Sequence, residues 1–361
     1  MMKDRIYNFA AGPSMLPDQV LEEISEELFN YHSSGMSVME MSHRSKGYLN
    51  IFNETKDTLR RVMNIPEEYE ILFMHGGATG QFAAVALNLL DNGEADYIVT
   101  GNFAKKAAKE AEKYGTVNIA YDGKDNNYSH IPEESELTLS KNARYVHLCA
   151  NNTIYGTEWN YFPDTYGVPL IADMSSDILS RNIDVSKFAL IYAGAQKNMG
   201  IAGLAAVIIR KDLISKCNPM TPQILSYEEM VKNDSMLNTP STFSIYVLGK
   251  VVKWIEEIGG IAEIEKRNKT KAKLIYDYLD SQDFYKPHAE KASRSMMNVT
   301  FTTPSPELDE LFAAKALEEG MSNLKGHRLV KGIRASIYNA MPYEGVEKLV
   351  EFMDRFAKEN G

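Results

Sequence analysis

Between residues 70 and 210 the chain alternates short apolar runs with segments of helical periodicity, and this alternation most constrains its fold. The apolar runs are rich in β-branched and aromatic residues, while segments such as 103–114 have the helical pattern. Such alternation predicts an α/β fold with a doubly wound, mostly parallel sheet. The expected strands are 71–74, 97–100, 117–120, 145–149, 170–172, 190–193 and 205–209.

The segments on either side of this block follow other patterns. The first sixteen residues are expected to be extended, and residues 17–31 predict an amphipathic helix with one apolar stripe. A passage predicted to be rich in loops, 217–240, precedes a helix at 245–258, and an α+β pattern starts after Gly259-Gly260. Its expected elements are helices at 261–279, 307–319 and 343–358 and strands at 297–302 and 333–338.

This change of pattern divides the chain into domains. We expect a large domain at 17–258 and a small C-terminal domain at 259–361, with an arm at 1–16 that joins the small domain. A chain of 361 residues with 44% hydrophobic content is long enough for two such domains.

Composition narrows the class of protein further. Cys149 and Cys217 lie far apart and outside any metal-ligand spacing, which argues against a disulfide framework and against a metal site. The N-terminal residues lack the apolar core of a signal peptide and no run of about eighteen apolar residues occurs, so we expect a soluble, cytoplasmic protein. A net charge of −10 without a basic block disfavours nucleic acid and anionic membranes as partners.

Lys197 follows a predicted buried strand closely, so it would lie at the mouth of the sheet. Desolvation there lowers the pKa of a lysine and yields the neutral amine that forms a Schiff base with an aldehyde. That chemistry is one way to anchor pyridoxal phosphate. For an isolated lysine, the simpler interpretation is an ammonium that extends into water, so the neighbouring motifs must decide.

Two further segments favour a cofactor site. Asp173 ends the apolar run 169–172. If this run pairs with the apolar run that precedes Lys197, Asp173 comes to the same sheet edge as Lys197, where it could keep a pyridine nitrogen protonated. The segment Gly76-Gly77-Ala78-Thr79-Gly80 opens a helical pattern, and its backbone N–H groups and hydroxyl could cradle a phosphate. Taken singly, each segment is better explained as a turn.

In combination these segments resemble the phosphoserine aminotransferases, a branch of the aspartate-aminotransferase-like enzymes that use pyridoxal phosphate. The resemblance runs nearly end to end and implies fold type I of the transferases dependent on this cofactor, with a seven-stranded, mostly parallel sheet in the large domain. Besides the glycine segment, the matching motifs are Asn8-Phe9-Ala10-Ala11-Gly12-Pro13, Ser42-His43-Arg44-Ser45, Ala172-Asp173-Met174-Ser175-Ser176, Gly194-Ala195-Gln196-Lys197-Asn198, Gly326-His327-Arg328 and Ile333-Arg334-Ala335-Ser336.

The resemblance also implies roles around the cofactor. Lys197 would bind it covalently and transfer the substrate proton, and Asp173 would pair with the ring nitrogen. Phe103 would stack on the ring where the family often has tryptophan, so an indole N–H contact would be lost. The other implied cofactor contacts are Ala78, Thr79, Thr153, Gln196 and, from the partner subunit, Asn238 and Thr239.

Substrate contacts follow from the same resemblance. Arg334 would hold the α-carboxylate, a planar anion that suits a guanidinium fork. The pairs His43-Arg44 and His327-Arg328 would bind the distal anion, a carboxylate in L-glutamate and a phosphate in 3-phosphohydroxypyruvate. The implied reaction yields O-phospho-L-serine and 2-oxoglutarate. Ala10-Ala11 stand where a serine is common in the family, which leaves glutamate positioning to backbone or water.

The resemblance implies a homodimer with shared sites, in which His43 and Arg44 serve the Lys197 of the other subunit. From the residues alone, His43-Arg44 is equally well explained as a solvated loop pair. Another aminotransferase or lyase of small amino acids, and a cofactor-binding protein without catalysis, remain alternatives. Whether a phosphorylated threonine analogue of vitamin B6 synthesis is also a substrate stays open. A desulfurase is disfavoured because neither cysteine lies in a recognisable reactive loop.

Overall fold

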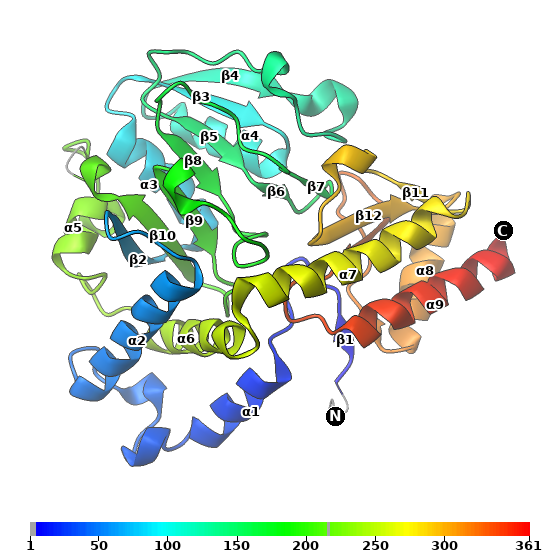
Figure 1. Ribbon diagram of the computed structural model, residues 1–361, viewed down its shortest axis with the longest axis horizontal. Coiled ribbons are helices and arrows are strands. Elements are labelled where there is room, and N and C mark those ends of the chain that lie inside the picture. Colours follow the sequence, from blue (N-terminus) through cyan, green and yellow to red (C-terminus); the bar gives the residue numbers. More distant parts are fainter. Residues whose placement is uncertain (1–4, 215–216) are drawn as a thin grey trace.

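The computed structural model describes residues 5–214 and 217–361, and a seven-stranded sheet lies at its centre (Figure 1). The strand order is β2-β10-β9-β8-β5-β3-β4, with β10 antiparallel to β2 and β9 and the other pairs parallel. This confirms the predicted fold class. The strands are β2 (Tyr69–His75), β3 (Glu94–Val99), β4 (Thr116–Asp122), β5 (Val146–Cys149), β8 (Leu170–Asp173), β9 (Leu190–Gly194) and β10 (Leu204–Arg210).

Helices cover both faces of this sheet, which explains why its strands read as continuous apolar runs. Ile71 and Phe73 of β2 pack into the core formed with α2 (Lys46–Val62) and α6 (Thr242–Glu257). Leu72 and Met74 point to the other face, into the core formed with three further helices. These are α3 (Gly77–Leu89), α4 (Asn102–Ala111) and α5 (Tyr227–Lys232).

The C-terminal part has a hydrophobic core of its own, around Phe301, Phe312 and Phe352. An antiparallel sheet of order β11-β12-β14 lies against it. The arm joins this part, because β1 (Tyr7–Asn8) pairs with β13 (Met321–Ser322). The other elements are α7 (Gly260–Asp280), β11 (Lys286–Pro287), β12 (Asn298–Thr302), α8 (Pro306–Glu318), β14 (Ile333–Ser336) and α9 (Tyr343–Asn360). The domain boundaries themselves stay a prediction.

Two predicted elements differ from the structure. The helix expected over 17–31 is α1 (Asp18–Glu27), and the helix cannot continue to residue 31 because Asn30 has a non-helical backbone, with φ −150° and ψ 81°. The passage predicted to be rich in loops contains the short α5, whose first turn is capped by Ser226. The expectations for residues 1–4 lie outside the described residues.

Candidate active site

The N-terminus of α3 forms one end of a cavity at the edge of the sheet. Gly76 and Gly77 have positive φ angles of 89° and 57°, which turn the chain from β2 into the helix. No side chain caps this helix, so the N–H groups of its first turn are available to a ligand, and Ala78 and Thr79 line the cavity. This is the geometry that binds a phosphate group.

Lys197 lies in the turn after β9 and reaches into the same cavity. Its ammonium donates to Thr153 Oγ1 at 2.8 Å and lies 5.6 Å from the centroid of the Phe103 ring. Desolvation lowers the pKa of Lys197 to about 8, although the Asp173 carboxylate opposes this shift. The lysine therefore has an accessible neutral form near neutral pH, as a nucleophile or proton carrier requires.

Asp173 ends β8, pairs in register with Cys149 of β5 and is almost fully buried. Its Oδ1 accepts a hydrogen bond from the Ser175 backbone N–H at 2.9 Å, and the Cys149 thiol donates to its Oδ2 at 3.8 Å. Burial raises the pKa of Asp173, while the Ser175 hydrogen bonds and the charge of Lys197 oppose the shift. The carboxylate is thus held rigidly where a cationic ring nitrogen would stabilise its charge.

The whole cavity has a volume of about 340 Å³. It is lined by the first turn of α3, by the Phe103 ring, by Lys197 and by the Asp173 carboxylate. The buried Gln196 Oε1 has no hydrogen-bond partner among the described residues, as expected for an acceptor that bonds a ligand. These groups fit pyridoxal phosphate. The residues that line the cavity are Gly76, Gly77, Ala78, Thr79, Phe82, Phe103, Cys149, Asn151, Thr153, Asp173, Ser175, Ser176, Gln196, Lys197 and Gly203.

A group of cations stands near this cavity. Arg334 of β14 is largely buried, and in the described part of the chain its Nε has no hydrogen-bond partner. The charge of Arg334 contributes to the lowered pKa of Lys197. Burial lowers the pKa of His327, and the charges of Arg334, Arg328 and Lys106 lower it further. The Gly326 N–H donates to the Gly332 carbonyl at 2.7 Å and the Arg334 N–H to the Leu324 carbonyl at 2.8 Å, so the segment that carries His327 and Arg328 lies beside β14.

The N-terminal arm holds the Lys197 turn in place. The Ser14 N–H donates to the Gln196 carbonyl at 3.0 Å, and the Ser14 hydroxyl donates to the Lys197 carbonyl. Gly12 has a φ of 132°, and a Cβ there would lie 3.2 Å from Lys197 Cγ. The Ala11 carbonyl accepts a hydrogen bond from the Tyr338 hydroxyl at 2.9 Å. The segment that contains Ala10 and Ala11 thus lies beside Lys197.

Seven predicted residues do not line the cavity: the nearby His327, Arg328 and Arg334, and also His43, Arg44, Asn238 and Thr239. Arg44 lies in the turn before α2 and is exposed, and its backbone N–H donates to Ser42 Oγ at 3.3 Å. Asn238 is exposed and lies 3.5 Å from the His75 ring, measured between Nδ2 and Nε2.

Sequence reasoning missed three residues near the site, Lys106, Cys149 and Ser175. Lys106 follows Phe103 by one helical turn, and its ammonium lies 5.5 Å from the Phe103 ring centroid. Cys149 closes a strand that the sequence does predict, so its place beside Asp173 depends only on strand order and register. Ser175 stands two residues after Asp173, a spacing at which a backbone N–H often bonds an Asp side chain.

Comparison with known proteins gives consistent matches. The aminotransferase class-V family model matches residues 6–349. The chain is 53% identical to a phosphoserine aminotransferase of Desulfatibacillum aliphaticivorans, over 100% of both chains, and 52% identical to one of Geobacillus kaustophilus, over 98% of this chain and 99% of that one. A solved phosphoserine aminotransferase from Bacillus circulans subsp. alkalophilus superposes with a TM-score of 0.97 at 47% identity, covering 99% of this chain and 100% of the other. The phosphoserine aminotransferase of Trichomonas vaginalis, solved with pyridoxal phosphate bound, has a TM-score of 0.93 at 40% identity, over 97% and 100% of the two chains.

Proposed function

Because this chain belongs to the phosphoserine aminotransferases of aminotransferase class V, we propose that the cavity around Lys197 transfers the amino group of L-glutamate to 3-phosphohydroxypyruvate. The family is the one that the sequence motifs indicated. The observation that carries the proposal is the convergence on one cavity of Lys197, Asp173 and the uncapped start of α3. His327 and the charges around it, Arg334, Arg328 and Lys106, favour substrates that carry two anionic groups.

The residues of the cavity would hold pyridoxal phosphate in a defined way. Lys197 would anchor its aldehyde, Asp173 would pair with the ring nitrogen and Phe103 would pack on the ring face. The N–H groups of Ala78 and Thr79 would bind the phosphate. When bound, this cofactor supplies a carbonyl that accepts the amino group and a ring that accepts electrons.

Lys197 would have a second role, as the base that takes the substrate proton. With a pKa of about 8, its neutral form is available to take the proton from the substrate Cα. The hydrogen bond to Thr153 and the contacts of Ser14 with the lysine's own turn keep the amine at that position. The buried Asp173 carboxylate would stabilise positive charge on the ring nitrogen of the cofactor.

Substrate recognition rests on the cations. Arg334 has a largely buried guanidinium whose Nε has no hydrogen-bond partner among the described residues, which suits the α-carboxylate that both substrates share. His327 and Arg328 lie beside Arg334 and would bind the distal anion. A pocket with several donors accepts either a carboxylate or a phosphate, so glutamate and the phosphorylated keto acid can use it in turn.

Replacement of Arg328 with alanine should weaken the phosphorylated acceptor more than an unphosphorylated one. A charge-assisted contact is worth about 1.5–3 kcal/mol, so kcat/KM for 3-phosphohydroxypyruvate should fall about ten- to a hundredfold. The loss for hydroxypyruvate should be much smaller. Steady-state kinetics with both acceptors measures the difference.

A matched control for that variant is Arg355→Ala. Arg355 of α9 is also an exposed arginine and pairs with Glu319 at 2.7 Å, but unlike Arg328 it is not among the charges that act on His327. Its replacement should leave both kcat/KM values unchanged. Equal losses on both acceptors in Arg328→Ala would give Arg328 a structural role and contradict its assignment to the phosphate.

We also propose that two copies of the chain form a dimer that completes each site. His43, Arg44, Asn238 and Thr239 do not line the cavity of their own chain, although the family resemblance gives them substrate and cofactor contacts. All four belong to segments outside the seven-stranded sheet. A two-fold partner could therefore present them to the Lys197 cavity, and this arrangement supports the assignment of His43 and Arg44 to the distal anion.

A further inference from the structure

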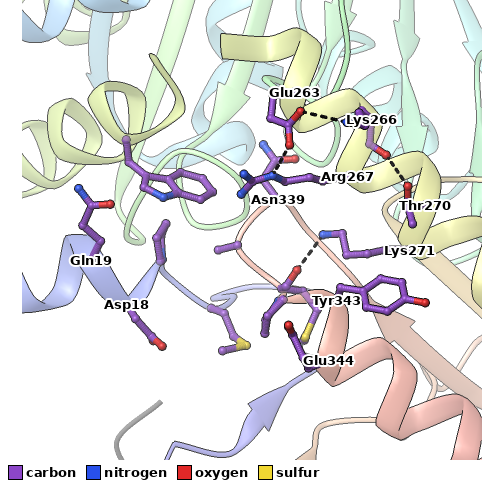
Figure 2. A pocket seen from close by; sticks show the side chains of 16 residues that line it. Asp18, Gln19, Glu263, Lys266, Arg267, Thr270, Lys271, Asn339, Tyr343 and Glu344 are labelled. Atoms are coloured by element: carbon purple, nitrogen blue, oxygen red, sulfur yellow. Dashed lines mark hydrogen bonds and ion pairs between the residues drawn. The ribbon is translucent and has the colours of Figure 1, made fainter. Parts of the chain in front are cut away.

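A second cavity, of about 470 Å³, lies where the arm, α6, α7 and the start of α9 meet (Figure 2). It is larger than the catalytic cavity of about 340 Å³ and shares no lining residue with it. Met15, Pro17, Trp254, Ala340 and Met341 give it an apolar lining. A concave, largely apolar site of this size with a few polar groups is typical of small-molecule binding sites.

Some charged side chains on the cavity wall have ionic partners, and others have donor atoms without a partner among the described residues. Asp18 is paired with Arg5, and Glu263 accepts a hydrogen bond from Arg267 Nε at 2.9 Å. The two terminal nitrogens of Arg267 have no hydrogen-bond partner among the described residues, which leaves them free for a ligand. Three further charged residues lie on the wall: Lys266, Lys271 and Glu344. The ammonium of Lys266 lies 3.8 Å from the Glu263 carboxylate, and Glu344 is exposed.

Lys271 is a buried cation without a counter-charge. It is 2% exposed and donates to the carbonyls of Ile337, Tyr338 and Met341 at 3.0, 2.7 and 3.0 Å. Three acceptors match the three protons of an ammonium, yet within the described residues no carboxylate pairs with it. Burial, aided by the charge of Arg267, lowers the pKa of Lys271 to about 7. An anion in the cavity would compensate this charge.

We propose that this cavity binds a small monocarboxylate with an apolar body, such as an arylacetate. The carboxylate binds the free nitrogens of Arg267 within the field of Lys271, and the ring packs on the apolar lining around Trp254. Figure 2 shows Arg267 and Lys271 extending from α7 toward the cavity, with Asp18 and Glu344 across from them. A bare phosphate would fill only a small part of 470 Å³ and would leave the apolar lining uncovered.

The cavity is connected to the catalytic turn by two short paths. Met15 lines it and follows Ser14, whose N–H donates to the Gln196 carbonyl at 3.0 Å. Asn339 also lines it, and its N–H donates to Asn198 Oδ1 at 3.0 Å. A ligand in this cavity would therefore contact Asn339, which bonds one side of the Lys197 turn, and Met15, which is next to the residue that bonds the other side. The site lies beyond the proposed amino transfer and does not depend on it.

Fluorine NMR of 4-fluorophenylacetate with the holoenzyme tests the proposal. Saturating 2-oxoglutarate is present throughout to keep the probe out of the catalytic cavity. We expect line broadening that saturates with protein, and an affinity at least about tenfold lower for Arg267→Gln, because a charge-assisted contact is lost. The neutral analogue 2-(4-fluorophenyl)acetamide should bind the wild-type protein correspondingly weakly.

The matched control is Arg61→Gln. Arg61 is likewise an exposed arginine whose Nε bonds a glutamate, Glu256, at 3.0 Å, but it does not line the cavity. Exposed pairs of this kind stabilise a protein little, so both variants should fold with unchanged Tm. Equal affinity of wild type and Arg267→Gln for the probe, or no saturable binding to wild type, would overturn the proposal.

Discussion

Lys197→Ala should abolish amino transfer, with an expected fall in kcat of at least about 10⁴-fold. The variant loses the covalent anchor of the cofactor and the base that moves the substrate proton, and proton transfer alone accounts for about 10²–10⁴-fold of such a rate. No other lysine lines the catalytic cavity among the described residues. Added amines of small size should restore part of the activity, because the cavity keeps its shape and Asp173.

The measurement that separates loss of the anchor from loss of folding is borohydride reduction followed by mass spectrometry of the intact chain. Wild type should retain the cofactor covalently and Lys197→Ala should not. Lys106→Ala is the matched control, since the ammonium of Lys106 lies 5.5 Å from the Phe103 ring centroid and that of Lys197 lies 5.6 Å from it. Lys106→Ala should keep the adduct. An adduct that survives in Lys197→Ala would exclude Lys197 as the anchor.

The double variant His43→Ala/Arg44→Ala is also expected to be nearly inactive as a homodimer, yet to regain activity when refolded with Lys197→Ala. In a mixed dimer with shared sites, one site carries both defects and the other carries none. Random pairing makes half of the dimers mixed, and each has one intact site of two, so about a quarter of wild-type activity should return. Specific activity after joint refolding is the measurement.

Two controls make this mixing experiment decisive. Each variant refolded alone should stay inactive, and mixing the two folded variants without unfolding should restore activity only as fast as subunits exchange. If His43 and Arg44 act on the Lys197 of their own chain, every site keeps a defect. Activity would then remain at the level of the separate variants after refolding, and the shared-site arrangement would be wrong.

The sheet was predictable from sequence because its strands are buried on both faces. Runs such as 71–74 are apolar at every position, since alternate residues pack on α2 and α6 or on α3 and α4. The short α5 and the early end of α1 were not predictable. The first depends on the Ser226 cap and on packing of Met230 in the core, and the second on the non-helical backbone of Asn30, which no glycine or proline signals.

The site residues that could be predicted from the sequence are those at the ends of predicted strands. Lys197 and Asp173 stand at the ends of apolar runs, so their place at one sheet edge follows from the strand prediction. Cys149 needs the register of β5 against β8 before it can be placed beside Asp173. Lys106 needs the orientation of α4, and the contacts of Ser14 need the path of the arm across the Lys197 turn. These depend on tertiary packing, which short-range patterns do not contain.

Absorption spectroscopy of the purified holoenzyme tests the central claim most directly. Addition of L-glutamate alone should replace the visible band of the lysine-bound cofactor with that of its amine form, as Lys197 is released and 2-oxoglutarate leaves. Subsequent 3-phosphohydroxypyruvate should restore the original band and yield one equivalent of O-phospho-L-serine per site. A cofactor spectrum that L-glutamate does not change, in a protein that binds the cofactor fully, would contradict the assignment of amino transfer to this cavity.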